Sequence, residues 1–311
     1  MRVLVAAAVF ALIALGAAAC SVAGSQKGAA YLLVTRDFGE RRMVAASEDP
    51  ISSGETAMRI LMRNARVKTR YGGRFVNAVN GVSSGSGGGK RLDWFYYVNG
   101  IEADVGAAEH KVYGGDRVWW DHHDWTDVMR VPAVVGSFPE PFLHGAEGKR
   151  YPIRIDCGQD DRSACDDASK KLQAAGIAPS TAVIGAAAGK EVLRVVIGKW
   201  DEVRQDAASE QIEEGPDKSG VFARFGAAGG GGFELDLLDA RARVLRTLGP
   251  GAGLVAATRF EDQAPTWVVA GTDATGVDRA VSLLEERTLA SRFAVATTGG
   301  APIPLPLGAA P

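Results

Sequence analysis

The chain has 311 residues, of which 46% are hydrophobic and 23% are charged, and its formal net charge at pH 7 is -2. This composition is typical of a folded globular protein, and the length is sufficient for two domains. A nearly neutral chain has no overall excess of positive charge to attract nucleic acid, so we expect no nucleic-acid partner.

The N-terminus predicts export from the cytoplasm. Arg2 provides a short positive region, residues 3–15 are apolar, and small residues follow up to Cys20. The apolar run is shorter than the roughly 20 residues that a membrane-spanning helix needs, so we interpret residues 1–19 as a signal peptide. The segment before Cys20 also resembles a bacterial lipobox, in which the cysteine is lipidated and becomes the mature N-terminus. Cleavage near Ala19 without lipidation is the alternative.

The expected location is therefore extracytoplasmic, at the cell membrane, with a lipid anchor on Cys20. Residues 20–29 are small and polar, and we interpret them as a tether. Two further cysteines, Cys157 and Cys165, stand close together. In an oxidising compartment such a pair favours a disulfide, and no histidine lies near it in the sequence to complete a metal site. We expect no metal site.

The first half of the chain begins with a strand pair and a helix. Residues 31–36 and 42–45 have the composition of strands and are joined by a short turn. Apolar residues between positions 57 and 65 recur at helical spacing, which predicts an amphipathic helix with Ser53 as its N-cap.

Further strands are expected after this helix. Residues 75–79, 94–98 and 117–120 are rich in aromatic and β-branched side chains. Asn99-Gly100 favours a tight hairpin turn, because both residues tolerate a positive φ. A sheet that holds one helix satisfies this order of elements, which is the β-grasp arrangement.

Large aromatic side chains concentrate between Arg91 and Trp125. Neighbouring residues in a strand point to opposite faces of the sheet, so Trp119 and Trp120 are expected on different sides. One face can fill a core. The rings on the other face must be covered by another part of the chain, by a second protein or by a ligand.

Residues 94–100, WFYYVNG, and residues 113–120, YGGDRVWW, are similar to the W-x-Y-x-V-N-G and L-x-x-G-D-x-V-x-W pattern of the transcobalamin C-terminal-like domain family. The resemblance covers residues 30 to 127 and implies a soluble-ligand-binding β-grasp domain, which we place at residues 30–129. It implies capture of a small ligand, a cobalamin-like or other cofactor-type molecule, for delivery to a membrane importer. The chain has no segment that matches the (α/α) barrel of the animal carriers.

We expect the ligand to stack on aromatic side chains at the end of the sheet, with polar side chains providing selectivity. No set of nucleophile, base and acid can be named, so we predict a protein that is not an enzyme and requires no cofactor other than the cobalamin-like ligand. The first alternative is a structural or adaptor protein of the cell envelope, whose aromatic face binds a protein partner or the second domain. A third hypothesis is a hydrolase whose site lies in the α/β domain, for which the sequence offers no nucleophile, base and acid to name. The predicted ligand-binding residues are Trp94, Tyr96, Tyr97, Asn99, Trp119, Trp120, Asp121, His122, His123 and Trp125.

The second half of the chain has a different pattern. Residues 130–150 are rich in proline and glycine and predict a linker. In residues 151–298 apolar strands alternate with helical stretches, which predicts a mixed α/β domain. Residues 299–311 are rich in proline and are expected to be a disordered tail. The predicted fold class is therefore α+β, with an N-terminal β-grasp-like domain followed by a mixed α/β domain.

Overall fold

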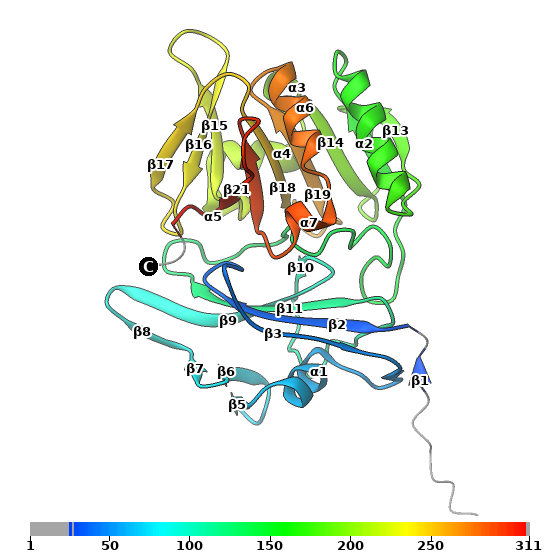
Figure 1. The fold of residues 1–311 in the computed structure, drawn as a ribbon, viewed down its shortest axis with the longest axis vertical. Helices are drawn as coiled ribbons and strands as arrows, with labels where there is room; N and C mark the ends of the chain where they lie inside the picture. The colour runs from blue at the N-terminus through cyan, green and yellow to red at the C-terminus, as the bar shows by residue number, and fades with distance from the viewer. Residues whose placement is uncertain (1–24, 27, 309–311) are drawn as a thin grey trace, which may run out of the picture.

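The computed structural model describes residues 25, 26 and 28–308, so the signal peptide and Cys20 lie outside the described residues. An N-terminal half and a C-terminal half pack against each other (Figure 1). In the described part of the chain, no helix is long and apolar enough to span a membrane. The fold class is α+β, as predicted, with a β-grasp-like domain followed by a mixed α/β domain.

A mixed sheet forms the centre of the N-terminal half. Its strand order is β10-β9-β11-β2-β3, and β8 pairs with β9. β2 and β11 run parallel, whereas the other neighbours are antiparallel. This arrangement positions the aromatic strands β9 and β11 near the middle of the sheet. The strands are β2 Ala30–Arg36, β3 Arg41–Glu48, β8 Gly85–Gly87, β9 Lys90–Val98, β10 Ile101–Glu102 and β11 Arg117–Asp124.

Helix α1, Ala57–Asn64, covers one face of this sheet. Its N-cap is Thr56, whose side chain accepts a hydrogen bond of 3.2 Å from the Arg59 backbone N–H. The prediction of Ser53 as the N-cap is wrong, because Ser53 lies in the preceding turn. The helix buries Ile60 and its neighbours against the sheet, as the apolar spacing predicted.

Short strands lie on the same side of the sheet as α1 (Figure 1). β5 Val67–Arg70, β6 Phe75–Val79 and β7 Val82–Ser83 form an antiparallel sheet. β1 Ser25–Gln26 pairs with β4 Ile51–Ser52. Part of the segment predicted to be a tether is therefore hydrogen-bonded to the domain.

The C-terminal half contains a seven-stranded sheet of order β13-β12-β14-β19-β18-β20-β21. β13, β12, β14 and β19 run parallel to one another, and the pairs β19–β18, β18–β20 and β20–β21 are antiparallel, which is the mixed arrangement predicted. The strands are β12 Ile153–Cys157, β13 Ser180–Val183, β14 Leu193–Lys199, β18 Gly253–Thr258, β19 Thr266–Gly271, β20 Ala294–Thr297 and β21 Ile303–Leu305.

Helices pack on this sheet, and a three-stranded sheet that the sequence patterns did not indicate lies beside it (Figure 1). The helices are α2 Arg162–Ala174, α3 Trp200–Val203, α4 Ala207–Glu214, α5 Pro216–Ser219, α6 Ala274–Ser282 and α7 Glu286–Leu289, and the additional strands are β15 Ala223–Ala227, β16 Phe233–Leu238 and β17 Val244–Leu248.

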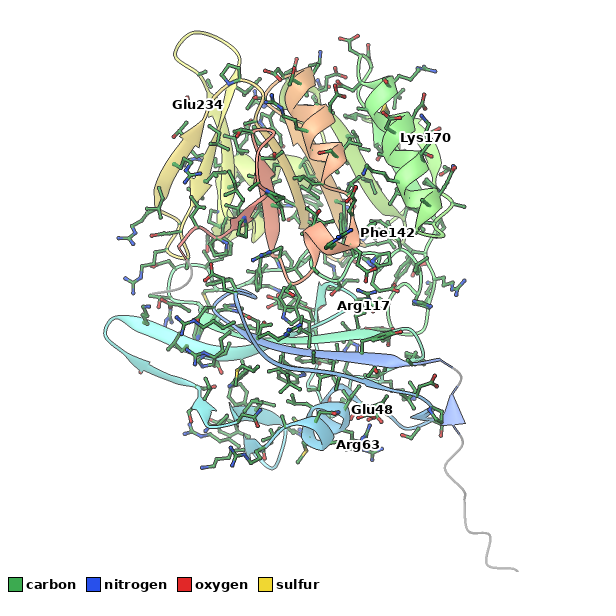
Figure 2. The ribbon with its side chains drawn as sticks, in the orientation of Figure 1. Glu48, Arg63, Arg117, Phe142, Lys170 and Glu234 are labelled. Carbon is green, nitrogen blue, oxygen red and sulfur yellow. A yellow bond between two sulfur atoms is a disulfide. The ribbon has the colours of Figure 1, made fainter. Side chains whose placement is uncertain are left out.

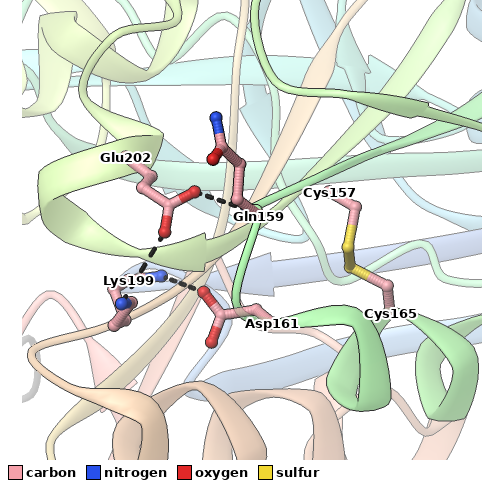
Figure 3. Close-up of a disulfide and its surroundings, with 6 residues drawn as sticks. All are labelled: Cys157, Gln159, Asp161, Cys165, Lys199 and Glu202. Carbon is pink, nitrogen blue, oxygen red and sulfur yellow. Dashed lines mark hydrogen bonds and ion pairs between the residues drawn. A yellow bond between two sulfur atoms is a disulfide. The ribbon is translucent and has the colours of Figure 1, made fainter.

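A disulfide joins Cys157, at the end of β12, to Cys165 in α2, which confirms the predicted pairing (Figure 3). Beside it, the Asp161 carboxylate accepts a hydrogen bond of 3.0 Å from the Lys199 backbone N–H. The Glu202 carboxylate accepts another, of 2.6 Å, from the Gln159 backbone N–H. Asp161, after β12, and Glu202, in α3 after β14, therefore hold the ends of the two strands together.

The segment predicted as a linker is part of the core. Residues 131–142 are all buried, and they run between the two halves of the molecule. The Val134 N–H donates a hydrogen bond of 2.8 Å to the Gly100 carbonyl, and the Val135 N–H donates one of 3.3 Å to the Phe293 carbonyl. The interpretation of residues 130–150 as a simple linker is wrong, because apolar side chains accompany the prolines and glycines and are buried.

The prediction of a disordered tail is wrong for residues 299–308. Residues Ile303–Leu305 form β21, which pairs with β20 at the edge of the large sheet. Pro304 lacks a backbone N–H, and an edge strand tolerates this loss because one side of the strand has no neighbour to bond. Proline content alone therefore did not decide the structure of the tail.

Candidate functional site

The aromatic strands β9 and β11 contribute to two different cores. Trp94 and Trp120 point toward α1 and pack with the apolar side of the helix. Tyr97 and Trp119 point to the opposite face and belong to a core that includes Trp200 of the C-terminal half. The alternation predicted from the sequence is confirmed, and both faces are covered by the chain itself.

Phe293 from the C-terminal half is at the centre of the second contact. Its ring lies edge-on to four rings of the N-terminal half, with centroid distances of 5.1 Å to Phe38, 5.8 Å to Tyr97, 5.3 Å to Trp119 and 5.5 Å to His123. The face of the sheet that carries Tyr97 and Trp119 was expected to be covered by another part of the chain, by a second protein or by a ligand. In the structure, the C-terminal half covers it.

Arg117 adds a polar contact at the same junction (Figure 2). Its guanidinium donates hydrogen bonds to the Glu286 carboxylate at 2.6 Å and to the Phe138 carbonyl at 3.1 Å. The two halves are therefore joined by a polar contact as well as by aromatic packing.

Asp121, a predicted ligand-binding residue, is fully buried in this junction. Its carboxylate accepts hydrogen bonds from the backbone N–H groups of Phe38 at 3.0 Å and Gly39 at 2.9 Å, and from Nδ1 of His123 at 2.9 Å. The Thr35 hydroxyl also donates to it. A buried carboxylate with this many donors holds the turn after β2 in place, and none of its oxygens faces solvent.

His122 and Asn99 have structural roles as well. His122 is buried against Trp94, and burial lowers the pKa of its imidazole. Asn99 adopts a positive φ of 55° in the hairpin turn, as predicted. Its amide nitrogen donates to Asp116 at 2.8 Å and to the Gly145 carbonyl at 2.9 Å. Both polar side chains are occupied within the fold.

Most of the predicted ligand-binding set is therefore inaccessible. Tyr96 is partly buried, and its hydroxyl donates a hydrogen bond of 2.6 Å to the Val105 carbonyl. Trp125 is also only partly buried. The prediction of an open aromatic groove is wrong for the eight other residues, because α1 and the C-terminal half cover them: Trp94, Tyr97, Asn99, Trp119, Trp120, Asp121, His122 and His123.

Trp125 lies at a different concavity, which we call the Tyr71 hollow. It has a volume of about 480 Å³ and is formed by the β5–β6 hairpin, the β7–β8 connection and the beginning of β9. Ligand clefts in proteins typically have volumes of about 300–1,000 Å³. The lining residues are Arg70, Tyr71, Phe75, Asn77, Ser84, Gly85, Ser86, Arg91, Leu92, Asp93 and Trp125.

Tyr71 is unusual among these residues. Its side chain is 80% exposed, and its backbone has a φ of 50°, in the left-handed region. A bulky residue in this region is strained by about 1–3 kcal/mol, and an exposed ring recovers little of that by packing. The Tyr71 ring does contact Phe75 edge-on, at a centroid distance of 6.2 Å. The hairpin therefore presents an aromatic ring to solvent at the rim of the hollow.

Polar groups line the same hollow. The side-chain oxygen Oδ1 of Asn77 is buried and has no hydrogen-bond partner among the described residues. Asp93 accepts hydrogen bonds from the Ser84 hydroxyl at 2.6 Å and from the Trp94 N–H at 2.9 Å. The Arg91 guanidinium lies 4.1 Å from the centroid of the Trp125 ring. The hollow thus combines ring faces, a cation and an unsatisfied acceptor.

Little in the sequence indicates this site. Tyr71 stands alone before Gly72-Gly73 and belongs to no periodic pattern, so only the run of turn residues after an aromatic residue marks it. Among the residues that the structure describes, no three or more His, Cys, Asp or Glu side chains are grouped so that they could hold a metal ion.

The comparisons with known proteins concern the N-terminal half of the chain. Residues 54–124 match a family model described as "Domain of unknown function (DUF4430)". These residues include every lining residue of the Tyr71 hollow except Trp125. The resemblance to the transcobalamin C-terminal-like family remains a prediction.

No curated protein matches the chain. Among solved structures, a protein from Ruminococcus gnavus described as a "putative metal binding protein" is similar to part of it, with 14% sequence identity and a TM-score of 0.26. The match covers 32% of this chain and 98% of that chain.

Proposed function

We propose that the protein is an extracytoplasmic, lipid-anchored binding protein that captures a small soluble ligand in the Tyr71 hollow. The observation that carries this proposal is the exposed Tyr71 ring, held by a left-handed backbone at the rim of a concavity of about 480 Å³. Strained backbone and exposed aromatic surface both reduce stability, and both occur where proteins bind ligands.

The lining suggests how a ligand is held. A ring-shaped ligand stacks on Tyr71, while Phe75 and Trp125 provide further apolar surface. A hydroxyl or amine of the ligand donates to Oδ1 of Asn77, which has no partner in the described structure. An unpaired buried acceptor costs about 1–3 kcal/mol, so a ligand that satisfies it gains affinity.

We propose binding without catalysis. No histidine or cysteine lines the hollow. The Ser84 hydroxyl donates a hydrogen bond to the Asp93 carboxylate, and the lining has no histidine to complete a nucleophile–histidine–carboxylate set. Delivery of the ligand to a membrane importer is part of the proposal, and it rests on the predicted lipid anchor at Cys20. We propose no protein partner for the aromatic face, because the C-terminal half covers it.

Calorimetry on the mature chain tests the proposal, with glucose, glucuronate, a set of vitamins and cyanocobalamin as the probes. For any probe that binds, we expect Tyr71→Ala to weaken binding about tenfold, because one aromatic stacking contact is lost. Tyr31→Ala is the matched control, because Tyr31 is 47% exposed and lies outside the hollow.

Tryptophan fluorescence provides a second readout. Five of the six tryptophans are at most 5% exposed, which leaves Trp125 as the accessible indole. Binding in the hollow should change the emission of Trp125 and protect it from a soluble quencher, and Trp125→Phe should abolish both effects. Binding of a probe with no response from Trp125 and no effect of Tyr71→Ala would contradict the proposed site.

A further inference from the structure

The charge of the chain is distributed unevenly around the Tyr71 hollow. The whole chain has 35 Lys and Arg residues against 37 Asp and Glu residues. The segment from residue 59 to residue 92, however, contains no acidic residue at all. The near-neutral total therefore conceals one strongly basic region, whose basic residues are Arg59, Arg63, Arg66, Lys68, Arg70, Arg74, Lys90 and Arg91.

The fold gathers this segment around the hollow. It supplies most of α1, strands β5, β6, β7 and β8, and the beginning of β9. Residues of β5, β6, β8 and β9 line the hollow. Lys68 and Arg70 are both exposed on β5. The pairing of β5 with β6 shifts register between Lys68 and Thr69. Arg70 lines the hollow, and Lys68 lies two residues before it on the same exposed strand, outside the lining.

Several of these cations have no acidic partner. Arg63, which belongs to α1, forms ion pairs with Glu48 and Glu55 (Figure 2). The Arg74 guanidinium lies 3.9 Å from the Glu109 carboxylate. In contrast, the exposed side chains of Arg66, Lys68, Arg70 and Lys90 form no ion pair with any described residue. An uncompensated cluster of this kind attracts anions, and the attraction is strongest where the surface is concave.

Inside the hollow the balance is also positive. The lining contains two cationic side chains, Arg70 and Arg91, and one carboxylate, Asp93. The Asp93 carboxylate already accepts hydrogen bonds from the Ser84 hydroxyl and the Trp94 N–H. The Arg91 guanidinium lies over the Trp125 ring and donates to the Thr126 carbonyl, so its donors are partly used. The Arg70 guanidinium forms no hydrogen bond, ion pair or ring contact with a described residue. Its planar guanidinium is suited to bind a carboxylate, phosphate or sulfate through two parallel hydrogen bonds.

We propose that the ligand of the Tyr71 hollow is an acidic sugar, free or as a unit of an anionic polysaccharide. The inference rests on the proposed function and deepens it. The sugar ring stacks on Tyr71, a hydroxyl donates to Asn77 Oδ1, and the acidic group binds Arg70. Lys68, exposed two residues before Arg70 and outside the hollow, contacts the next acidic unit of a polymer.

The test compares ligands that differ only in charge. Calorimetry on the mature chain uses glucuronate against glucose, and polygalacturonate against dextran, at low and at high salt. We expect each acidic probe to bind at least tenfold more tightly than its neutral partner, and the difference to decrease at high salt because exposed charges are screened. Binding of polygalacturonate alone identifies a polymer as the ligand, and equal binding of glucuronate identifies the free sugar.

Variants locate the binding. Arg70→Gln is expected to weaken binding of the acidic probe about tenfold, because a charge-assisted hydrogen bond is lost. Lys68→Gln is expected to weaken binding of polygalacturonate but not of glucuronate. Arg246→Gln is the matched control, because Arg246 is exposed on β17, in the other half, and forms no ion pair with a described residue.

The two proposals fail in different ways. If glucose binds as tightly as glucuronate, and Tyr71→Ala weakens both while Arg70→Gln weakens neither, the acidic-sugar inference is overturned and the hollow remains a ligand site. If acidic probes bind but Tyr71→Ala and Arg70→Gln have no effect, the site is elsewhere and the inference also fails. If no sugar in either series binds, the acidic-sugar inference is overturned. The proposed function is then supported if a vitamin or cyanocobalamin binds in the hollow and contradicted if none of them binds.

Discussion

Replacement of Phe293 by alanine tests whether the two halves form one cooperative unit. Phe293 is 2% exposed, and it is the residue of the C-terminal half whose ring meets Phe38, Tyr97, Trp119 and His123. Truncation removes the ring from the junction and leaves a cavity, because the surrounding rings belong to strands that cannot easily move inward.

The expected loss in the free energy of unfolding is about 3–5 kcal/mol, the usual range for a buried phenylalanine changed to alanine. A loss of 1 kcal/mol lowers the melting temperature by about 2–4 °C in domains of 150–250 residues and by less in a larger cooperative unit, so the melting temperature should fall by about 5–10 °C. Phe293→Leu keeps most of the volume and should lose about 1.5 kcal/mol or less.

Urea unfolding followed by near-ultraviolet circular dichroism and by far-ultraviolet circular dichroism measures this loss. If the halves are coupled, both signals shift together in a single transition. A loss below about 1 kcal/mol, or a near-ultraviolet spectrum that the substitution leaves unchanged, would show that the aromatic junction does not hold the molecule together.

Two further predictions concern pH and the disulfide. Burial lowers the pKa values of His110 and His122, so each histidine takes up a proton more readily in the unfolded chain. The contribution of these two histidines to the free energy of unfolding is therefore fully present above about pH 6.5. It is lost as the pH drops below that value, by up to about 1.4 kcal/mol per pH unit for each histidine. Urea midpoints at pH 7.5 and 5.5 measure this slope, which His122→Gln should reduce and which should not have the opposite sign. The Cys157–Cys165 disulfide closes a short loop, with a sequence separation of 8. The chain-entropy model gives about 2.5 kcal/mol for it, so a double alanine variant should lose that amount in urea unfolding, and a reductant should then have no further effect; a variant as stable as the parent protein would refute this estimate.

The strands and their two faces could be predicted from the sequence because side-chain alternation is a local property. Trp119 and Trp120 do point to opposite sides of β11, and Asn99 does form the hairpin turn. What covers each face depends on residues far away in the chain. Phe293 lies more than 150 positions after Trp119, and no local pattern indicates that the two rings meet.

Polarity was the second source of error. Asp121, His122 and His123 are consecutive polar residues at the end of a strand, a pattern that is typical of exposure to solvent. In the structure their partners are backbone N–H groups, a carbonyl and aromatic rings supplied by other strands and loops. The actual candidate site depends on Tyr71, an isolated aromatic residue in a turn, whose exposure only the folded hairpin reveals.

A single sheet with buried rings on both faces also limits how the protein can be divided in the laboratory. Cutting the chain before residue 130 would remove the C-terminal half that covers Tyr97 and Trp119. The N-terminal fragment would then expose a large hydrophobic surface. Such a fragment would self-associate, and non-specific binding of small molecules to its exposed hydrophobic surface could not be distinguished from specific ligand binding. Ligand screens are therefore meaningful only with both halves in one polypeptide.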